Sequence, residues 1–109
     1  MRDETLQPIY STKAEDPELL EPISDFVIAL APEIDRLQDI QEAADYQQLR
    51  TQCTLLQARC LDMGYPHLAE IAEEVAVACS LEKEESIHLG LLAITDLARR
   101  VRLGHRGAA

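Results

Sequence analysis

Residues 45–66, DYQQLRTQCTLLQARCLDMGYP, predict one amphipathic helix with a marked start and a marked end. Their apolar residues recur at spacings of four and three, which places them on a single stripe of the helix. Asp45 can cap the first turn. Gly64 can take the left-handed conformation that ends a helix, and Pro66 suits the first turn of the next one. The inward stripe comprises Leu49, Cys53, Leu56, Cys60 and Met63.

The chain before this segment begins with a stretch that shows no helical period. Residues 1–15 contain Pro8 and are expected to form an extended lead-in. Asp16 and Pro17 mark a helix start, because the carboxylate can cap the turn and the proline needs no N–H there. We expect Pro22 to interrupt this short helix.

A longer helix is predicted after that interruption. Ser24 is its cap candidate, and Pro32 is expected to kink it or split it in two. The period relaxes at residues 42–44, where we expect a turn. Its inward face comprises Phe26, Val27, Leu30, Ile34 and Leu37, and its outer side comprises Glu33, Asp35, Gln38 and Asp39.

Two more helices are indicated after residue 65. Pro66 opens the first, and Ser80 is expected to end it and to cap the second. The last helix has acidic residues near its start and basic residues near its end, which complements the helix dipole. The inward residues are Leu68, Ile71, Val75 and Cys79 in the first helix, and Ile87, Leu91, Ile94, Ala98 and Val101 in the second.

These patterns predict an all-α fold, an antiparallel up-down four-helix bundle with a short N-terminal helix or extended lead-in. The expected organisation is a lead-in at residues 1–15, the bundle at 16–103 and a flexible tail at 104–109. A chain of 109 residues is long enough for one domain with one core.

Composition excludes several classes of function. A net charge of −10 argues against nucleic acid as a partner, because phosphate binding needs clustered Lys and Arg. No apolar run is long enough to span a bilayer and the first residues lack a secretory signal, so a cytoplasmic protein is expected. Cys53, Cys60 and Cys79 form no C-x-x-C pair, so buried, reduced thiols are expected and neither a metal nor a cofactor is predicted.

No residue pattern points directly to catalysis. His67 falls in the first turn of its predicted helix, His88 lies one step off the apolar stripe of the last helix, and His105 belongs to the tail. The acidic pairs and runs suit solvated helix faces. There is no nucleotide-binding loop and no activated nucleophile.

The order and spacing of several segments resemble the histidine-containing phosphotransfer (HPt) domain of bacterial two-component relays. The resemblance extends from about Pro8 to Val101 and includes the PIYS lead at residues 8–11, the Asp16-Pro17 pair and the helix leading to Asp45. It is strongest over residues 45–66, which are similar to the family pattern D-x-x-x-L-x-x-x-x-H-x-L-K-G followed by G-[FY]-P. The matching residues are Asp45, Leu49, Leu56, Gly64, Tyr65, Pro66 and Leu68.

The departures from the family pattern lie at its reactive positions. Thr54 stands where the resemblance implies the phosphorylated histidine, Gln57 where it implies lysine, and Ala58 where it implies glycine. A threonine phosphoester is stable, and a hydroxyl without a base is a weak nucleophile, so no phosphotransfer activity is expected. Loss of the lysine removes a charge that would stabilise a phosphoryl group.

The resemblance implies that a docking surface is retained. We define the docking strip as Thr54, Leu55, Gln57, Ala58 and Leu61, and expect it to bind a response-regulator receiver domain or a histidine kinase, with the protein a monomer or weak homodimer. Two alternatives stay open. One is phosphotransfer through a displaced histidine, with His88 as the candidate. The other is a purely structural helical interaction or dimerisation module.

Overall fold

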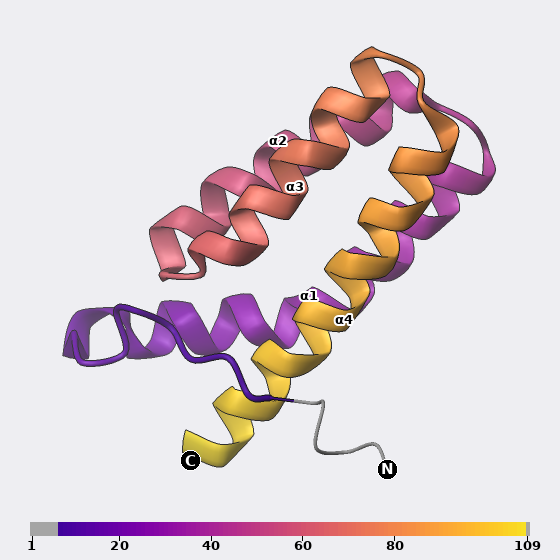
Figure 1. Ribbon diagram of the computed structural model, residues 1–109. Helices are drawn as coiled ribbons and strands as arrows, with labels where there is room; N and C mark the ends of the chain where they lie inside the picture. The colour runs from indigo at the N-terminus through magenta and orange to yellow at the C-terminus, as the bar shows by residue number, and fades with distance from the viewer. Residues whose placement is uncertain (1–6, 109) are drawn as a thin grey trace, which may run out of the picture.

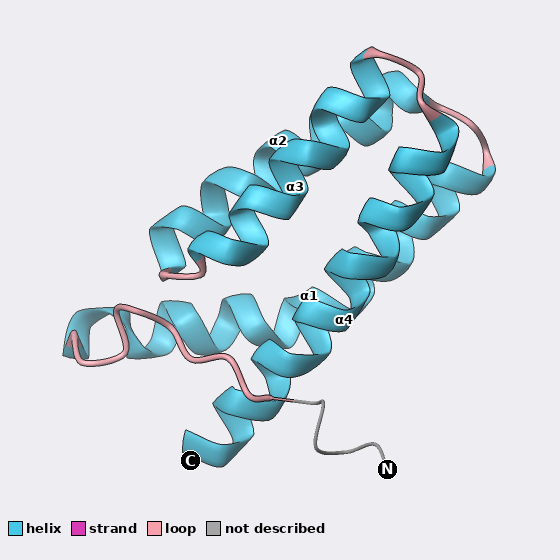
Figure 2. Cartoon of the chain, viewed as in Figure 1, coloured by secondary structure: helices cyan, strands magenta, loops and turns pink. Residues whose placement is uncertain are grey.

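The structure, a computed structural model, describes residues 7–108, and over this part of the chain the protein is all-helical. A 3-10 turn, η2 (Pro17–Leu19), precedes α1 (Leu20–Glu42), α2 (Tyr46–Met63), α3 (Pro66–Ser80) and α4 (Glu84–Ala108). Figures 1 and 2 show these helices joined by short connections. Helix α1 packs on α2 and α4, and α3 also packs on both α2 and α4. These contacts are compatible with a helical bundle. The all-α prediction is confirmed, because the regular elements of residues 7–108 are all helical.

One hydrophobic core lies between the four helices. Each helix buries the stripe that its periodicity predicted, although Phe26, Met63 and Ile71 are only partly buried at its edge. Because aromatic residues are few, branched aliphatic side chains, alanines and three thiols fill most of the interior. The side chains that are almost fully buried include Leu30, Leu37, Leu49, Cys53, Leu56, Cys60, Leu68, Val75, Ile87, Ile94 and Val101.

Helix α1 starts earlier than the sequence predicted and passes two prolines. The expected interruption at Pro22 and the expected cap at Ser24 are both wrong, because α1 begins at Leu20. Pro22 is the third residue of the helix, where a missing N–H costs no intrahelical hydrogen bond. Pro32 lies inside the helix without splitting it. Figure 1 shows α1 changing direction near its middle, which agrees with the alternative of a kink.

Glu33 is a second correction to α1. The sequence placed this residue on the outer side, but it is only 8 % exposed. Asp35 and Asp39, which were assigned to the same side, are exposed as predicted. Glu33 lies three residues after the buried Leu30 and four before the buried Leu37, so helical spacing places it at the border of the apolar stripe.

The connection between α3 and α4 is longer than predicted. Helix α3 ends at Ser80 as expected, but Ser80 does not cap α4, which starts at Glu84. Leu81 to Lys83 form the turn, and Glu82 has a φ of +54°. Helix α4 then continues to Ala108, so residues 104–108 are helical where a flexible tail was predicted.

The expected lead-in, residues 1–15, is described from residue 7 onward, because residues 1–6 lie outside the described part of the chain. Residues 7–11 have no regular secondary structure, residues 12–15 form a turn where an extended segment was predicted, and the segment contacts both α2 and α4. Ile9 N donates to Arg100 O of α4 at 3.0 Å, and Thr12 N donates to Gly64 O at the end of α2 at 2.8 Å. Gly104 lies so close to Ile9 that a Cβ atom there would overlap the Ile9 carbonyl oxygen. The lead-in therefore ties the C-terminal end of α2 to α4. None of the helices described combines enough length and apolar character to cross a bilayer.

Candidate functional site

The ends of α2 set the position of the docking strip. Asp45 Oδ1 accepts a hydrogen bond from Gln48 N at 3.1 Å, which caps the first turn. At the other end Gly64 has a φ of +87°, and Tyr65 N donates to Cys60 O at 2.8 Å. This left-handed ending satisfies carbonyl groups that the helix itself leaves free. Both predicted limits of the helix are confirmed.

The docking strip occupies the exposed part of α2. Thr54 and Ala58 are exposed, Leu55 and Leu61 are each 51 % exposed, and Gln57 is partly buried. Successive residues of a helix are rotated by about 100°. Gln57 and Leu61 therefore lie on one flank of Thr54, and Leu55 lies on the opposite flank. The five residues form a broad surface around Thr54 rather than a single line.

Thr54 offers a hydroxyl that is already engaged by its own helix. Its Oγ1 donates to Arg50 O at 2.9 Å. This i to i−4 bond is common for threonine within helices. Arg50 in turn extends away from the strip and donates from Nη1 to Ser80 Oγ on α3 at 3.3 Å. No contact found for Thr54 in the structure provides a base that would activate its oxygen for nucleophilic attack.

A shallow groove lies beside the strip, between the second half of α2 and the start of α3. It has a volume of about 520 Å³, and Gln57 and Leu61 line it from α2. Pro66, His67 and Glu70 line it from α3. His67 is exposed in the first turn of α3 and is a neighbour of the strip, a position that the sequence did not indicate. The signal that was present is its place directly after Gly64-Tyr65-Pro66, which brings α3 back against α2.

The other two histidines lie elsewhere. His88 is exposed on α4 and its Nδ1 lies 3.4 Å from Gln41 Nε2, at the end of α1. His105 is partly buried in α4 and shares a cavity with Tyr10 and Leu20, so it is not part of a solvated tail. Neither residue lines the groove beside the docking strip.

The cysteines are internal and unpaired. Cys53, Cys60 and Cys79 are all buried as free thiols. Burial raises the pKa of Cys53 and of Cys60 from 9.0 to about 12, because a thiolate loses its hydration in the core. No cluster of His, Cys, Asp or Glu suited to a metal ion occurs among residues 7–108. The thiols therefore act as small apolar side chains of the core.

Comparison with known proteins identifies no relative, since no family model, curated protein or solved structure matches the chain.

Proposed function

We propose that the protein is an HPt-like signalling module that binds a receiver domain or a histidine kinase without carrying a phosphoryl group. In this proposal the helices form an antiparallel up-down bundle, and the docking strip on α2 is the contact surface. The module acts as an adaptor or as a competitor for the partner of an active phosphotransfer domain.

The position of Thr54 is the observation that carries the proposal. Helix α2 keeps the cap at Asp45 and the left-handed end at Gly64 that the family pattern requires. Between these limits, the place of the reactive imidazole is taken by an exposed side chain whose hydroxyl donates to Arg50 O. A preserved scaffold with a replaced nucleophile favours binding over phosphotransfer.

The chemistry of the strip suits a protein partner. Leu55 and Leu61 expose apolar surface on both flanks of Thr54, and the small Ala58 allows a partner to approach α2 closely. The groove beside Leu61 provides a concave edge for a side chain of the partner. Grouped exposed apolar side chains of this kind can mark a protein–protein contact.

A binding titration tests the proposal. Receiver domains and kinase dimerisation domains from the same organism are titrated into the protein by isothermal calorimetry. Ala58→Asp places a charge at the centre of the strip and is expected to weaken binding at least about tenfold, a change of about 1.4 kcal/mol. Ala31→Asp is the matched control, because Ala31 is an exposed residue of α1. Absence of any binding partner, or equal affinity of the two variants, contradicts the proposal.

The displaced-histidine alternative names His88, which does not line the groove beside the docking strip, and the place of His67 in that groove makes His67 a second candidate. His88 instead lies against α1. Incubation with a phosphorylated receiver, followed by mass spectrometry under neutral conditions, separates the two histidines. An acid-labile phosphoryl group on either histidine replaces the binding-only proposal with this alternative.

The dimerisation alternative is favoured by exposed apolar residues on α3, on α4 and in the turn between them. Val77, Leu81, Leu89 and Leu92 are each more than half exposed. Light scattering over a concentration series measures the oligomeric state. A stable dimer that Leu89→Glu dissociates, together with no receiver binding, supports a structural module.

A further inference from the structure

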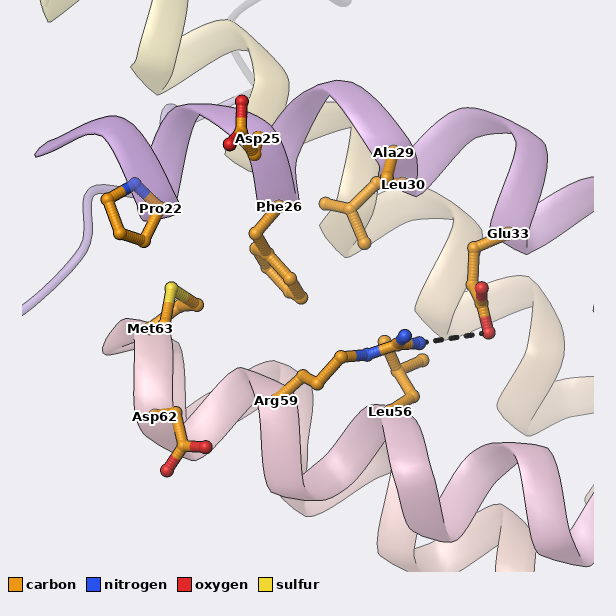
Figure 3. A pocket seen from close by; sticks show the side chains of 10 residues that line it. All are labelled: Pro22, Asp25, Phe26, Ala29, Leu30, Glu33, Leu56, Arg59, Asp62 and Met63. Atoms are coloured by element: carbon orange, nitrogen blue, oxygen red, sulfur yellow. Dashed lines mark ion pairs between the residues drawn. The ribbon is translucent and has the colours of Figure 1, made fainter. Parts of the chain in front are cut away.

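A second concave site lies on the other side of α2, against the first half of α1. It is a cavity of about 310 Å³, at the lower end of the volumes that bind small molecules. Figure 3 shows its walls, with Phe26 and Leu30 projecting from α1, and Leu56 and Met63 from α2. No residue of the docking strip lines this cavity.

A buried carboxylate lies at one end of these apolar walls. The side chain of Glu33 is only 10 % exposed, and no residue in the described part of the chain donates a hydrogen bond to its Oε2. Its neighbour is Arg59, whose Nη2 lies 3.2 Å from Oε2 in an ion pair that lacks hydrogen-bond geometry. Buried carboxylate oxygens normally accept hydrogen bonds, because dehydration of the charge is otherwise costly. Glu33 is therefore an acceptor with unused capacity.

The guanidinium of Arg59 does not close the site. Its side chain is 51 % exposed and reaches across the cavity from α2, as the dashed line in Figure 3 shows. Because Arg59 is half exposed, its guanidinium can turn toward water, and a ligand cation that takes its place keeps the buried Glu33 carboxylate paired. A positively charged ligand can thus take its place beside Glu33.

The charges around the cavity select the sign of a ligand. Asp25 and Asp62 also line the cavity, so its lining residues carry three carboxylates and one guanidinium. This balance repels anions and attracts cations. The ring of Phe26 adds a face suited to a cation, and its position is supported by stacking on Tyr65 with ring centres 5.7 Å apart.

We propose that the cavity between α1 and α2 binds a small organic cation, an ammonium group on a compact apolar body. The ammonium donates to Glu33, and the apolar body lies between Phe26 and Met63. The lining residues of this cavity and the docking strip do not overlap, so the test of cation binding does not depend on the proposed receiver binding.

A matched pair of probes tests the charge requirement on the unmodified protein. Phenethylammonium and 2-phenylethanol share the same aromatic body and differ in the charged group. In an NMR titration, phenethylammonium is expected to give saturable shifts at cavity residues below about 10 mM, and the alcohol to bind at least about tenfold more weakly. Equal binding of both probes, or no saturation by phenethylammonium, overturns the proposal.

Two conservative variants test the residue assignment. Glu33→Gln keeps the shape of the side chain and removes its charge, so the affinity for phenethylammonium should fall at least about tenfold. Asp35→Asn removes one carboxylate from the exposed side of the same helix and should change affinity less than about twofold. An equal loss in both variants would indicate nonspecific attraction to an acidic protein and would also overturn the proposal. Because the probe pair needs no variant, poor folding of Glu33→Gln leaves that test intact.

Discussion

Replacement of Gly64 by alanine is expected to destabilise the protein more than a typical surface substitution. Gly64 has a φ of +87°, a conformation that costs an L-residue with a Cβ atom about 1–2 kcal/mol. The new Cβ would also overlap Ser11 Oγ and lie 2.9 Å from the backbone nitrogens of Thr12 and Lys13. The lead-in would have to move away from the end of α2.

That movement breaks two identified hydrogen bonds. Thr12 N donates to Gly64 O at 2.8 Å, and Ser11 Oγ donates to Met63 O. Each hydrogen bond contributes about 0.5–1.5 kcal/mol to the free energy of unfolding. Alanine offsets about 0.4–1 kcal/mol of the loss, because it restricts the conformations of the unfolded chain. The net expectation for Gly64→Ala is a loss of about 3 kcal/mol in the free energy of unfolding.

Urea denaturation followed by far-ultraviolet circular dichroism measures this loss. The m-value should stay unchanged, because the surface exposed on unfolding is similar. Ser11→Ala is the control, since it removes one hydrogen bond without backbone strain and should cost about 1 kcal/mol. If the free energy of unfolding of Gly64→Ala lies within about 1 kcal/mol of the wild-type value, neither the left-handed conformation of Gly64 nor its contact with the lead-in contributes as argued.

Two further predictions concern the chemistry of α2. The double variant Thr54→His, Gln57→Lys should accept a phosphoryl group from a phosphorylated receiver, which would appear as an acid-labile label on the protein. The wild type and the control double variant Thr54→Ala, Gln57→Lys should carry no such label. Absence of label from Thr54→His, Gln57→Lys would count against the HPt-like assignment. The second prediction is that the free energy of unfolding falls between pH 9 and about 12. The unfolded chain releases the thiol protons of Cys53 and Cys60 near pH 9.0, whereas the folded core retains them, because it raises the pKa of each thiol to about 12. Urea titrations across that range should show a smaller fall for Cys60→Ala, and an equal fall would contradict this cause.

Most of the fold could be predicted because helical periodicity is a local property. The stripe of α2, the cap at Asp45 and the left-handed end at Gly64 depend on residues within a few positions of one another. The helix was therefore predicted with both limits. Apart from the burial of Glu33, the errors in α1 and α4 concern helix ends, where Pro22 is tolerated in a first turn and a turn of three residues replaces the direct cap at Ser80.

The candidate site was predicted only in part. The exposed positions of Thr54, Leu55, Ala58 and Leu61 follow from the buried stripe of the same helix, but their binding role is still a proposal. The groove with His67 was missed, because it depends on the register of α3 against α2. Periodicity reports which face of a helix is inward and does not report which neighbour lies beside the outer face.

By itself, the sequence determined the helical class, the apolar stripes and the absence of an imidazole at position 54. These features are written in residue identity and spacing. The tertiary structure alone decided that Glu33 is buried beside Arg59, because the burial of a border residue depends on what another helix places over it. It also decided that the lead-in crosses from α2 to α4, since Ile9 and Thr12 bond to carbonyl groups far away in the chain. Contacts between distant segments carry no local period, and for that reason only the folded chain contains them.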